Sequence, residues 1–265
     1  MRSFAYHKPA TLDEATRLLA TDDHACLLAG GQTLLPTLKN RLASPSALID
    51  LKGVADLDSI RKTGDALIIG ALARHSVVAA SPIVVESIPA LAHLAANIGD
   101  AQVRNRGTLG GSVANNDPAA DYPAALLGLG ATIKTTSREI AADAFFVGMF
   151  ETALKPGEIA VSVTFPVPRR AAYVKFPSPA SRYAMVGVFV AETKQGPRVA
   201  VTGAATCVFR WAAAEAALAK SFAPDALRAL KAPGGDFLTD IHGGADYRAS
   251  LVISMTRRAV AAASG

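Results

Sequence analysis

Two pairs of adjacent glycines, each flanked by hydroxyl residues, constrain this chain most. The first lies in Ala29-Gly30-Gly31-Gln32-Thr33, at the end of an apolar run, and the second in Thr108-Leu109-Gly110-Gly111-Ser112. Adjacent glycines allow positive φ and leave consecutive N–H groups uncovered, and such groups bind phosphate oxygens. Neither segment has the spacing of the Rossmann or P-loop motifs, so those two nucleotide-binding folds are not indicated. One pair alone is more typical of a tight turn, but two together favour a diphosphate held from two sides.

The first fifty residues carry the pattern of a small βαβ unit. Thr11 and Glu14 have capping-box spacing, and a helical apolar stripe follows them. The apolar runs over Ala25–Ala29 and Ala47–Leu51 predict two buried strands. Because a crossover separates these runs, we expect the strands to be parallel. One or two helical turns are expected after Pro36.

The rest of the chain predicts a mixed fold that changes character near Pro166–Arg170. The expected elements before that point are a hairpin over 59–70, a helix over 85–97, a loop over 99–108, a buried helix after Pro123 and a strand over 158–166. Beyond it, three antiparallel strands are expected over 173–176, 183–192 and 198–209, and helices from Trp211 onward. We therefore expect an α+β fold with a domain over residues 1–170, made of a small βαβ part and a larger α+β part, and a C-terminal domain over 171–265 with a three-stranded antiparallel sheet and helices.

Composition excludes several classes of protein. Hydrophobic residues make up 51% of the chain, which is enough burial to exclude intrinsic disorder. The longest charge-free run, His24 to Leu38, is shorter than the roughly 20 residues of a membrane span, so we expect no membrane association. The net charge is +5, but the basic residues are scattered along the chain and have no aromatic residues between them. We therefore expect no nucleic-acid partner. The N-terminus lacks a signal-peptide pattern and the two distant cysteines predict reduced core thiols, which favours a cytoplasmic location.

A polar segment, Asn115-Asn116-Asp117-Pro118-Ala119-Ala120-Asp121, follows the second glycine pair. Its local pattern favours an Asx turn at Asp117 and a helix cap at Asp121. The alternative is that both carboxylates contact a ligand. The histidine spacings predict no metal site, and no pattern of a catalytic acid, base or nucleophile stands out.

Together these segments resemble the flavin-binding medium subunits of the molybdenum hydroxylases, the family of the xanthine dehydrogenase flavin domain and the carbon monoxide dehydrogenase medium subunit. The likeness continues through Phe145-Phe146 to Glu158, Lys175-Phe176, Ser181-Arg182-Tyr183, Gly203-Ala204-Ala205, Tyr247-Arg248 and Arg257-Arg258-Ala259. It departs from the family at Thr33, where serine is common, at Asn115-Asn116, where His-Ala is frequent, and in the short segment 134–141. None of these departures removes a backbone donor.

The resemblance implies a PCMH-type FAD-binding domain whose two glycine pairs wrap the FAD diphosphate. The residues it implies for FAD binding are Leu28, Ala29, Gly30, Gly31, Gln32, Thr33, Leu34, Ile98, Thr108, Gly110, Gly111, Ser112, Asn115, Asp117, Asp121, Ile159, Lys175 and Tyr183, with no catalytic or metal-binding residues. Without the resemblance, Lys175 fits a surface lysine and Tyr183 a core aromatic. The pairs Tyr247-Arg248 and Arg257-Arg258 fit a solvated or capping role on the last helix, and a subunit contact is the alternative.

The resemblance also implies an oxidoreductase subunit that works inside a heterotrimer. A molybdopterin-binding large subunit would oxidise the substrate, and a [2Fe–2S] small subunit would pass electrons to FAD. FAD would deliver them to an external acceptor, which is NAD, a quinone or oxygen. Two alternatives stay open, namely a stand-alone flavin oxidoreductase with its own substrate pocket and a flavin-free assembly subunit.

Overall fold

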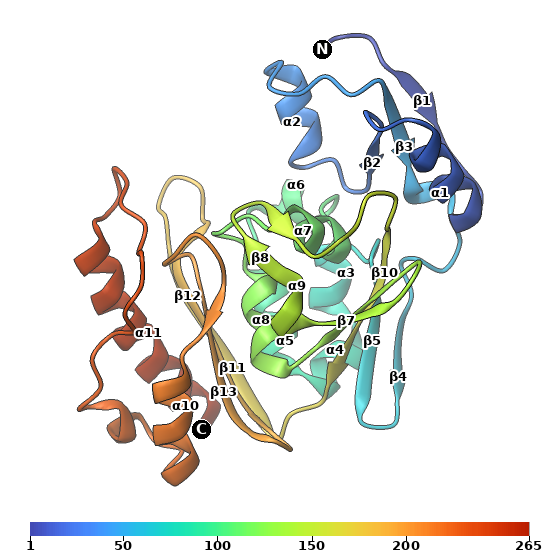
Figure 1. The fold of residues 1–265 in the computed structure, drawn as a ribbon. Coiled ribbons are helices and arrows are strands. Elements are labelled where there is room, and N and C mark those ends of the chain that lie inside the picture. The colour runs from blue at the N-terminus through green and yellow to red at the C-terminus, as the bar shows by residue number, and fades with distance from the viewer. Residues whose placement is uncertain (265) are drawn as a thin grey trace.

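The chain folds into three parts that follow one another in sequence (Figure 1), and the computed structural model describes residues 1–264. The N-terminal part consists of β1 (Ala5–His7), α1 (Leu12–Thr21), β2 (Cys26–Leu28), α2 (Leu34–Lys39), β3 (Ala47–Asp50) and the 3-10 turn η1 (Leu51–Gly53). Strand β3 lies between β1 and β2 and is parallel to both. The expected parallel pair is thus confirmed, and β1 is an additional strand. Thr11 caps α1 by accepting from the Glu14 N–H at 3.2 Å, as the capping-box spacing predicts.

The central part is a five-stranded antiparallel sheet covered by short helices. Its elements are β4 (Ile60–Thr63), β5 (Ala66–Gly70), α3 (His75–Ala80), α4 (Pro82–Ser87), α5 (Pro89–Ala96), α6 (Ala101–Arg104), α7 (Leu109–Asn115), α8 (Tyr122–Leu129), β6 (Thr132–Thr135), β7 (Glu139–Ala141), α9 (Ala142–Phe145), β8 (Phe146–Gly148), β9 (Glu151–Thr152) and β10 (Ala160–Pro166). The sheet order is β4-β5-β10-β6-β7, and β8 pairs with β9 as a separate hairpin.

The prediction of one continuous helix over 85–97 is wrong, although the region is helical. Two helices, α4 and α5, cover this region and meet at Ile88, which has φ −143°. Pro89 has no N–H to continue the first helix and occupies the first turn of the second, where a missing donor costs nothing. The expected loop over 99–108 also contains the single helical turn α6.

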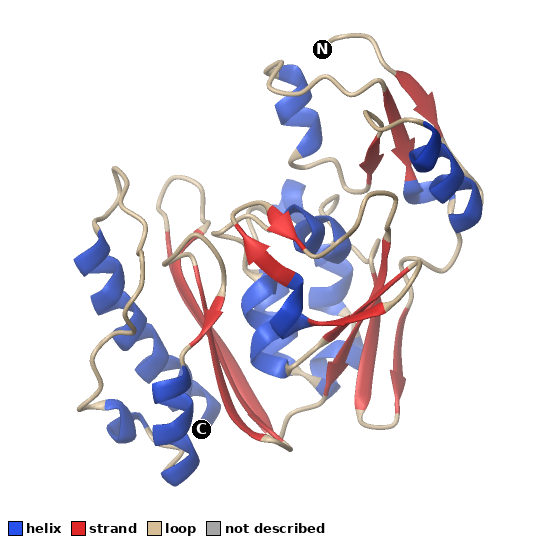
Figure 2. Ribbon diagram, viewed as in Figure 1, coloured by secondary structure: helices blue, strands red, loops and turns tan. Residues whose placement is uncertain are grey.

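The C-terminal part is a sheet with its own helices on one face, and its other face packs on helices of the central part (Figure 2). Its elements are β11 (Arg170–Pro177), β12 (Ala184–Thr193), β13 (Gly196–Thr202), β14 (Phe209–Arg210), α10 (Ala212–Lys220), the 3-10 helix η2 (Pro224–Leu227) and α11 (Ala245–Ser264). The antiparallel order is β11-β12-β13-β14, so the expected three-stranded sheet has a fourth strand. The predicted strand over 198–209 is two strands, because β13 ends at Thr202 and β14 begins at Phe209.

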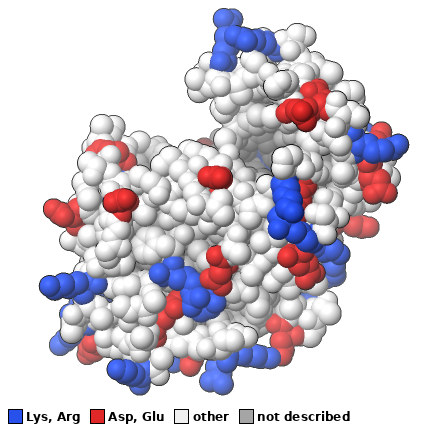
Figure 3. All heavy atoms as spheres, viewed as in Figure 1, with Lys and Arg blue, Asp and Glu red and all other residues white. Residues whose placement is uncertain are grey.

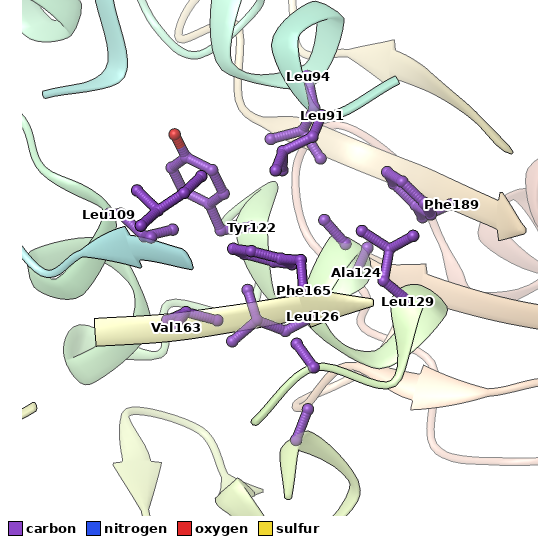
Figure 4. Packing of buried hydrophobic residues seen from close by; sticks show 14 of the residues in the cluster. Leu91, Leu94, Leu109, Tyr122, Ala124, Leu126, Leu129, Val163, Phe165 and Phe189 are labelled. Atoms are coloured by element: carbon purple, nitrogen blue, oxygen red, sulfur yellow. The ribbon is translucent and has the colours of Figure 1, made fainter. Parts of the chain in front are cut away.

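One apolar core joins the central and C-terminal parts. Alternate residues of β12 face opposite sides: Val188 packs with the core under α10 and α11, and Phe189 packs with that of the central helices. Figure 4 shows Phe189 beside Leu129 of α8, with Phe165 of β10 nearby. This double burial explains the nearly continuous apolar run of β12. The boundary at Pro166–Arg170, which connects β10 to β11, stays a prediction.

Charged residues are spread over the visible face without a patch of one sign (Figure 3). Arg248 is an exception to the solvated face expected of the last helix. It is buried and donates to the carbonyls of Met185 and Gly203 and to the Asp240 carboxylate, so it ties α11 to the sheet. No helix within residues 1–264 has the length and apolar character that crossing a bilayer would require.

Candidate functional site

A cavity of about 500 Å³, called here the central cavity, lies where the three parts meet. Figure 3 shows that the visible face is hollowed between the N-terminal part and the rest of the chain. The predicted residues that line the central cavity are Ala29, Gly30, Gly31, Gln32, Thr33, Leu34, Ile98, Thr108, Gly110, Gly111, Ser112, Asn115, Asp117, Asp121, Ile159 and Tyr183. Its volume is typical of a pocket for a small molecule or cofactor. Of the predicted set, only Leu28 and Lys175 do not line it.

The first glycine pair forms an open backbone loop at the cavity wall. Gly31 has φ +75°, a left-handed conformation that favours glycine. Gly30 lies so close to the loop before α7 that an added Cβ would come within 2.3 Å of the Arg106 carbonyl oxygen. The N–H groups of residues 30–33 have no acceptor among residues 1–264. This loop therefore has the free donors that an anionic group requires.

The second glycine pair lies in a helix, and not in a turn with positive φ as the pattern of adjacent glycines predicts. Gly110 and Gly111 occupy the first turn of α7, and neither has a positive φ. The N–H of Gly110 donates to the Ala71 carbonyl at 2.8 Å, and that of Gly111 to Thr108 Oγ1 at 3.2 Å. These two donors are thus already used. The small residues serve close packing here, since a Cβ on Gly110 would lie 2.5 Å from that of Ala71.

Asp121 is the most buried charged group of the site and does not act as a helix cap. Its carboxylate accepts from the Tyr173 hydroxyl and forms an ion pair with Lys175, whose Nζ lies 3.0 Å from Oδ1. Lys175 Nζ also donates to the Asn97 carbonyl at 2.8 Å. Burial raises the pKa of Asp121 above its ordinary value, although Lys175 and Tyr173 both oppose this shift. From sequence alone Lys175 fits a surface lysine. This interpretation is wrong, because the side chain of Lys175 is only 9% exposed.

In the polar segment that follows α7, some residues line the cavity and others stabilise the fold. Asp117 forms the expected Asx turn by accepting from the Ala119 N–H at 2.9 Å. Asn116 is buried in the left-handed region with φ +42°, and its Nδ2 donates to the carbonyls of Gly148 and Glu151 at 2.8 Å. Asn116 thus holds the β8–β9 hairpin in place. Its neighbours on either side line the cavity.

Tyr183 lies at the exposed side of the cavity. Its side chain is outside the core, with 48% of the residue exposed just before β12 begins, so the alternative of a core aromatic is wrong. Burial raises its pKa, with smaller contributions from Asp117 and Asp121. Ile159, in contrast, is a fully buried apolar wall.

His75 lines the central cavity and was not predicted. It begins α3, is 4% exposed, and its Nδ1 has no partner among residues 1–264. Burial lowers its pKa to about 4, so the ring is neutral at pH 7. Its ring lies 5.4 Å from that of Tyr122, whose hydroxyl also has no partner among those residues. Figure 4 shows this hydroxyl turned away from the labelled apolar side chains. No sequence pattern indicates His75, because a histidine without a partner at metal-ligand or catalytic spacing belongs to no motif.

The other lining residues that were not predicted are mostly apolar. They are Cys26, Leu27, Thr37, Leu51, Ala71, Leu72, Val103, Gly107, Ala114, Ala120 and Ala160. Five of these eleven, Leu27, Gly107, Ala114, Ala120 and Ala160, lie next to predicted residues in the chain. Within residues 1–264, no three His, Cys, Asp or Glu side chains lie together as the ligands of a metal ion would.

Comparison with known proteins places these features in one family. Residues 2–168 match the family described as the FAD binding domain in molybdopterin dehydrogenase. The nicotine 6-hydroxylase medium subunit of Paenarthrobacter nicotinovorans is 36% identical over 96% of this chain and 95% of its own length. The carbon monoxide dehydrogenase medium chain of Hydrogenophaga pseudoflava is 35% identical over 98% and 96%. Among solved structures, a chain of the Cu,Mo-CO dehydrogenase superimposes with a TM-score of 0.94 at 32% identity, covering 99% of this chain and 98% of that one. This chain therefore belongs to the FAD-binding medium subunits of the molybdenum hydroxylase family, and it is the flavoprotein component of an oxidoreductase.

Proposed function

We propose that this chain relays electrons inside a molybdenum hydroxylase complex. It would receive them from the [2Fe–2S] clusters of a small subunit and pass them through FAD to an external acceptor, which is NAD, a quinone or oxygen. A molybdopterin-binding large subunit would oxidise the substrate. The observation that carries this proposal is the central cavity, which brings both glycine pairs and the Asp117–Asp121 segment to one place. The names of the relatives, medium subunits and medium chains, support a role within a complex.

The lining of the central cavity fits FAD. The free N–H groups of residues 30–33 are suited to phosphate oxygens. Side chains at Gly30 and Gly31 would displace this loop, because a Cβ on Gly30 would clash with the Arg106 carbonyl and one on Gly31 with the Leu35 side chain. The unpartnered Nδ1 of His75 is a buried polar atom that a ligand with polar ring atoms would satisfy. Bound FAD supplies the redox chemistry, because it accepts and donates electrons.

The residues of this chain would bind, orient and shield the cofactor. The backbone of residues 30–33 would hold the diphosphate, with Thr108 and Ser112 beside it. Ile98 and Ile159 provide apolar walls that exclude water. Tyr173 and Lys175 fix the Asp121 carboxylate from behind, so it can accept a hydrogen bond from the ligand without moving.

Two measurements test the proposal. The purified chain should take up FAD without a covalent bond, so acid precipitation should release all flavin into the supernatant, and FAD should raise the melting temperature. A tag on this chain in its native host should recover a molybdopterin subunit and a [2Fe–2S] subunit. Recovery of a lone flavoprotein that turns over a small substrate at a normal rate would contradict the relay role.

Both cysteines are free in the structure, which supports the proposal that the complex works in the cytoplasm.

A further inference from the structure

A second cavity, of about 520 Å³, lies beside the central one and shares no lining residue with it. It is formed by the end of α5, the turn α6, the end of β11 and the turn between β11 and β12. The wall between the two cavities contains the Lys175–Asp121 ion pair, because Lys175 lines the second cavity and Asp121 lines the central one.

The lining of the second cavity is cationic. Arg104, Lys175 and Arg182 line it together with His93, and no Asp or Glu does. Lys175 is paired with Asp121, whereas Arg104 and Arg182 have no carboxylate partner among residues 1–264. Arg104 Nη1 donates only to the carbonyls of Ile98 and Gly99, at 3.0 and 3.2 Å. Two guanidinium groups without a counter-charge in one cavity attract an anion.

A buried hydroxyl in the same lining also lacks a partner. Ser178 is 5% exposed, and its Oγ has no hydrogen bond within residues 1–264. Burying such a group without a partner is unfavourable, so its presence indicates a ligand that supplies one.

The backbone around Ser178 is held in place. Its N–H donates to the Tyr183 carbonyl and its carbonyl accepts from the Arg182 N–H, both at 2.8 Å. Arg182 itself has φ +62°, a conformation that non-glycine residues rarely adopt. The turn therefore fixes the backbone of Ser178 and Arg182, from which the hydroxyl and the guanidinium extend, in the lining of the cavity.

We propose that the second cavity binds the anionic group, a phosphate or a carboxylate, of a small-molecule ligand through Arg104, Arg182 and the Ser178 hydroxyl. The shared wall couples this site to the central cavity, because Lys175 lies within reach of the anion and holds Asp121 at the same time. The anion site stands without FAD, whereas the coupling rests on the proposed function.

The test is calorimetric titration of the full-length chain with inorganic phosphate, pyrophosphate and acetate, at an ionic strength fixed with chloride. Either phosphate or acetate should bind with a Kd of about 1 mM or tighter, and the better probe identifies the class of anion. Arg182→Gln should weaken binding about tenfold and Ser178→Ala about fivefold. The control Arg257→Gln removes an exposed charge on α11 and should change nothing. The coupling is measured by titrating the chain with FAD in the absence and in the presence of the anion. The anion should change the Kd for FAD, and Lys175→Met should abolish that change.

Three results would overturn the anion site: no binding of any probe by the wild-type chain, equal weakening in Arg182→Gln and Arg257→Gln, or unchanged binding in Ser178→Ala and Arg182→Gln. A chain that binds phosphate but not FAD would refute the proposed function and keep the anion site. A chain that binds FAD but no anion would do the reverse.

Discussion

The Lys175–Asp121 ion pair allows a quantitative test of how the site is built. Its two side chains are 9% and 3% exposed, and Nζ lies 3.0 Å from Oδ1. Substituting Lys175→Met keeps most of the length of the side chain and removes its charge. Asp121 then stays buried, with the Tyr173 hydroxyl as its remaining side-chain donor.

The expected loss of stability is large. At 3.0 Å the attraction between two unit charges is about 5–6 kcal/mol for an effective dielectric constant of 20. Removing one partner of a buried pair typically costs about 3–5 kcal/mol, because the other charge loses its compensation. Tyr173 still donates to Asp121, so we expect about 3 kcal/mol in the free energy of unfolding at pH 7.

The loss should depend on pH in a defined direction. Without Lys175 the pKa of Asp121 rises further above its unfolded value, since burial then acts with less opposition. The folded variant therefore takes up a proton more readily than the unfolded chain, and the difference from wild type should shrink as the pH falls. The double variant Lys175→Met/Asp121→Asn should recover much of the loss at pH 7.

Urea unfolding at pH 7 and pH 5 measures both effects. The matched control is Lys194→Met, which breaks the ion pair between Lys194 and Asp65. That pair is shorter, at 2.7 Å, but its side chains are 68% and 78% exposed, so its loss should cost no more than about 1 kcal/mol. A Lys175→Met variant as stable as the Lys194→Met variant, or a loss that is the same at both pH values, would refute the reasoning.

Three further predictions concern single residues. Gly31→Val should abolish FAD binding, because its φ is +75° and its Cβ would lie 2.9 Å from Leu35 Cδ1, so the loop would have to move, whereas Gly64→Val, at φ +57° in open space, should retain binding. Equal flavin content in the two variants would show that the site is misplaced. Thr108→Val should lower stability by about 1 kcal/mol by removing the cap of α7, and an unchanged urea midpoint would contradict that role. Glu158 accepts from Arg138 and three other donors that hold its pKa far below the ordinary 4.5, so its stabilisation should be lost as the pH falls from about 4.5. Glu158→Gln should flatten this acid limb of the stability curve, and an equally steep limb in the variant would show that other groups cause it.

Elements with a local determinant were predicted closely. The hairpin expected over 59–70 is formed by β4 and β5, with the turn at Gly64-Asp65. The expected antiparallel strands β12 and β13 are joined by Lys194-Gln195, next to Gly196. Turn residues fix backbone geometry by their own conformational preferences, so no distant contact is needed to identify them.

Two short strands that depend on a distant partner, β1 and β14, were not predicted. Strand β1 is three exposed residues that become a strand by pairing with β3, more than forty positions away. Strand β14 is two residues held against β13. Both strands are too short to show the alternation of apolar and polar residues that identifies a strand in sequence. The break at Ile88 differs, because Pro89 marks it in the sequence.

The two glycine pairs look alike in sequence but act differently. Gly31 has the positive φ and the free neighbouring N–H groups that the pattern predicts. Gly110 is helical and allows α7 to approach Ala71, a contact that no local pattern contains. A glycine pair thus indicates that a side chain is not tolerated. Whether a ligand or a neighbouring backbone takes that space depends on the tertiary fold.

The side chains behind the cavity show where sequence reasoning ends. Lys175 and Tyr183 were included only through family resemblance, and His75 was not included. The properties of Lys175 and His75 depend on their surroundings. Lys175 pairs with a carboxylate fifty-four residues away, and burial lowers the pKa of His75 to about 4. Desolvation and pairing belong to positions in space, so residue type and spacing do not encode them. The sequence can therefore indicate a loop with free backbone donors, as at Gly31, whereas the electrostatics around a cavity require the structure.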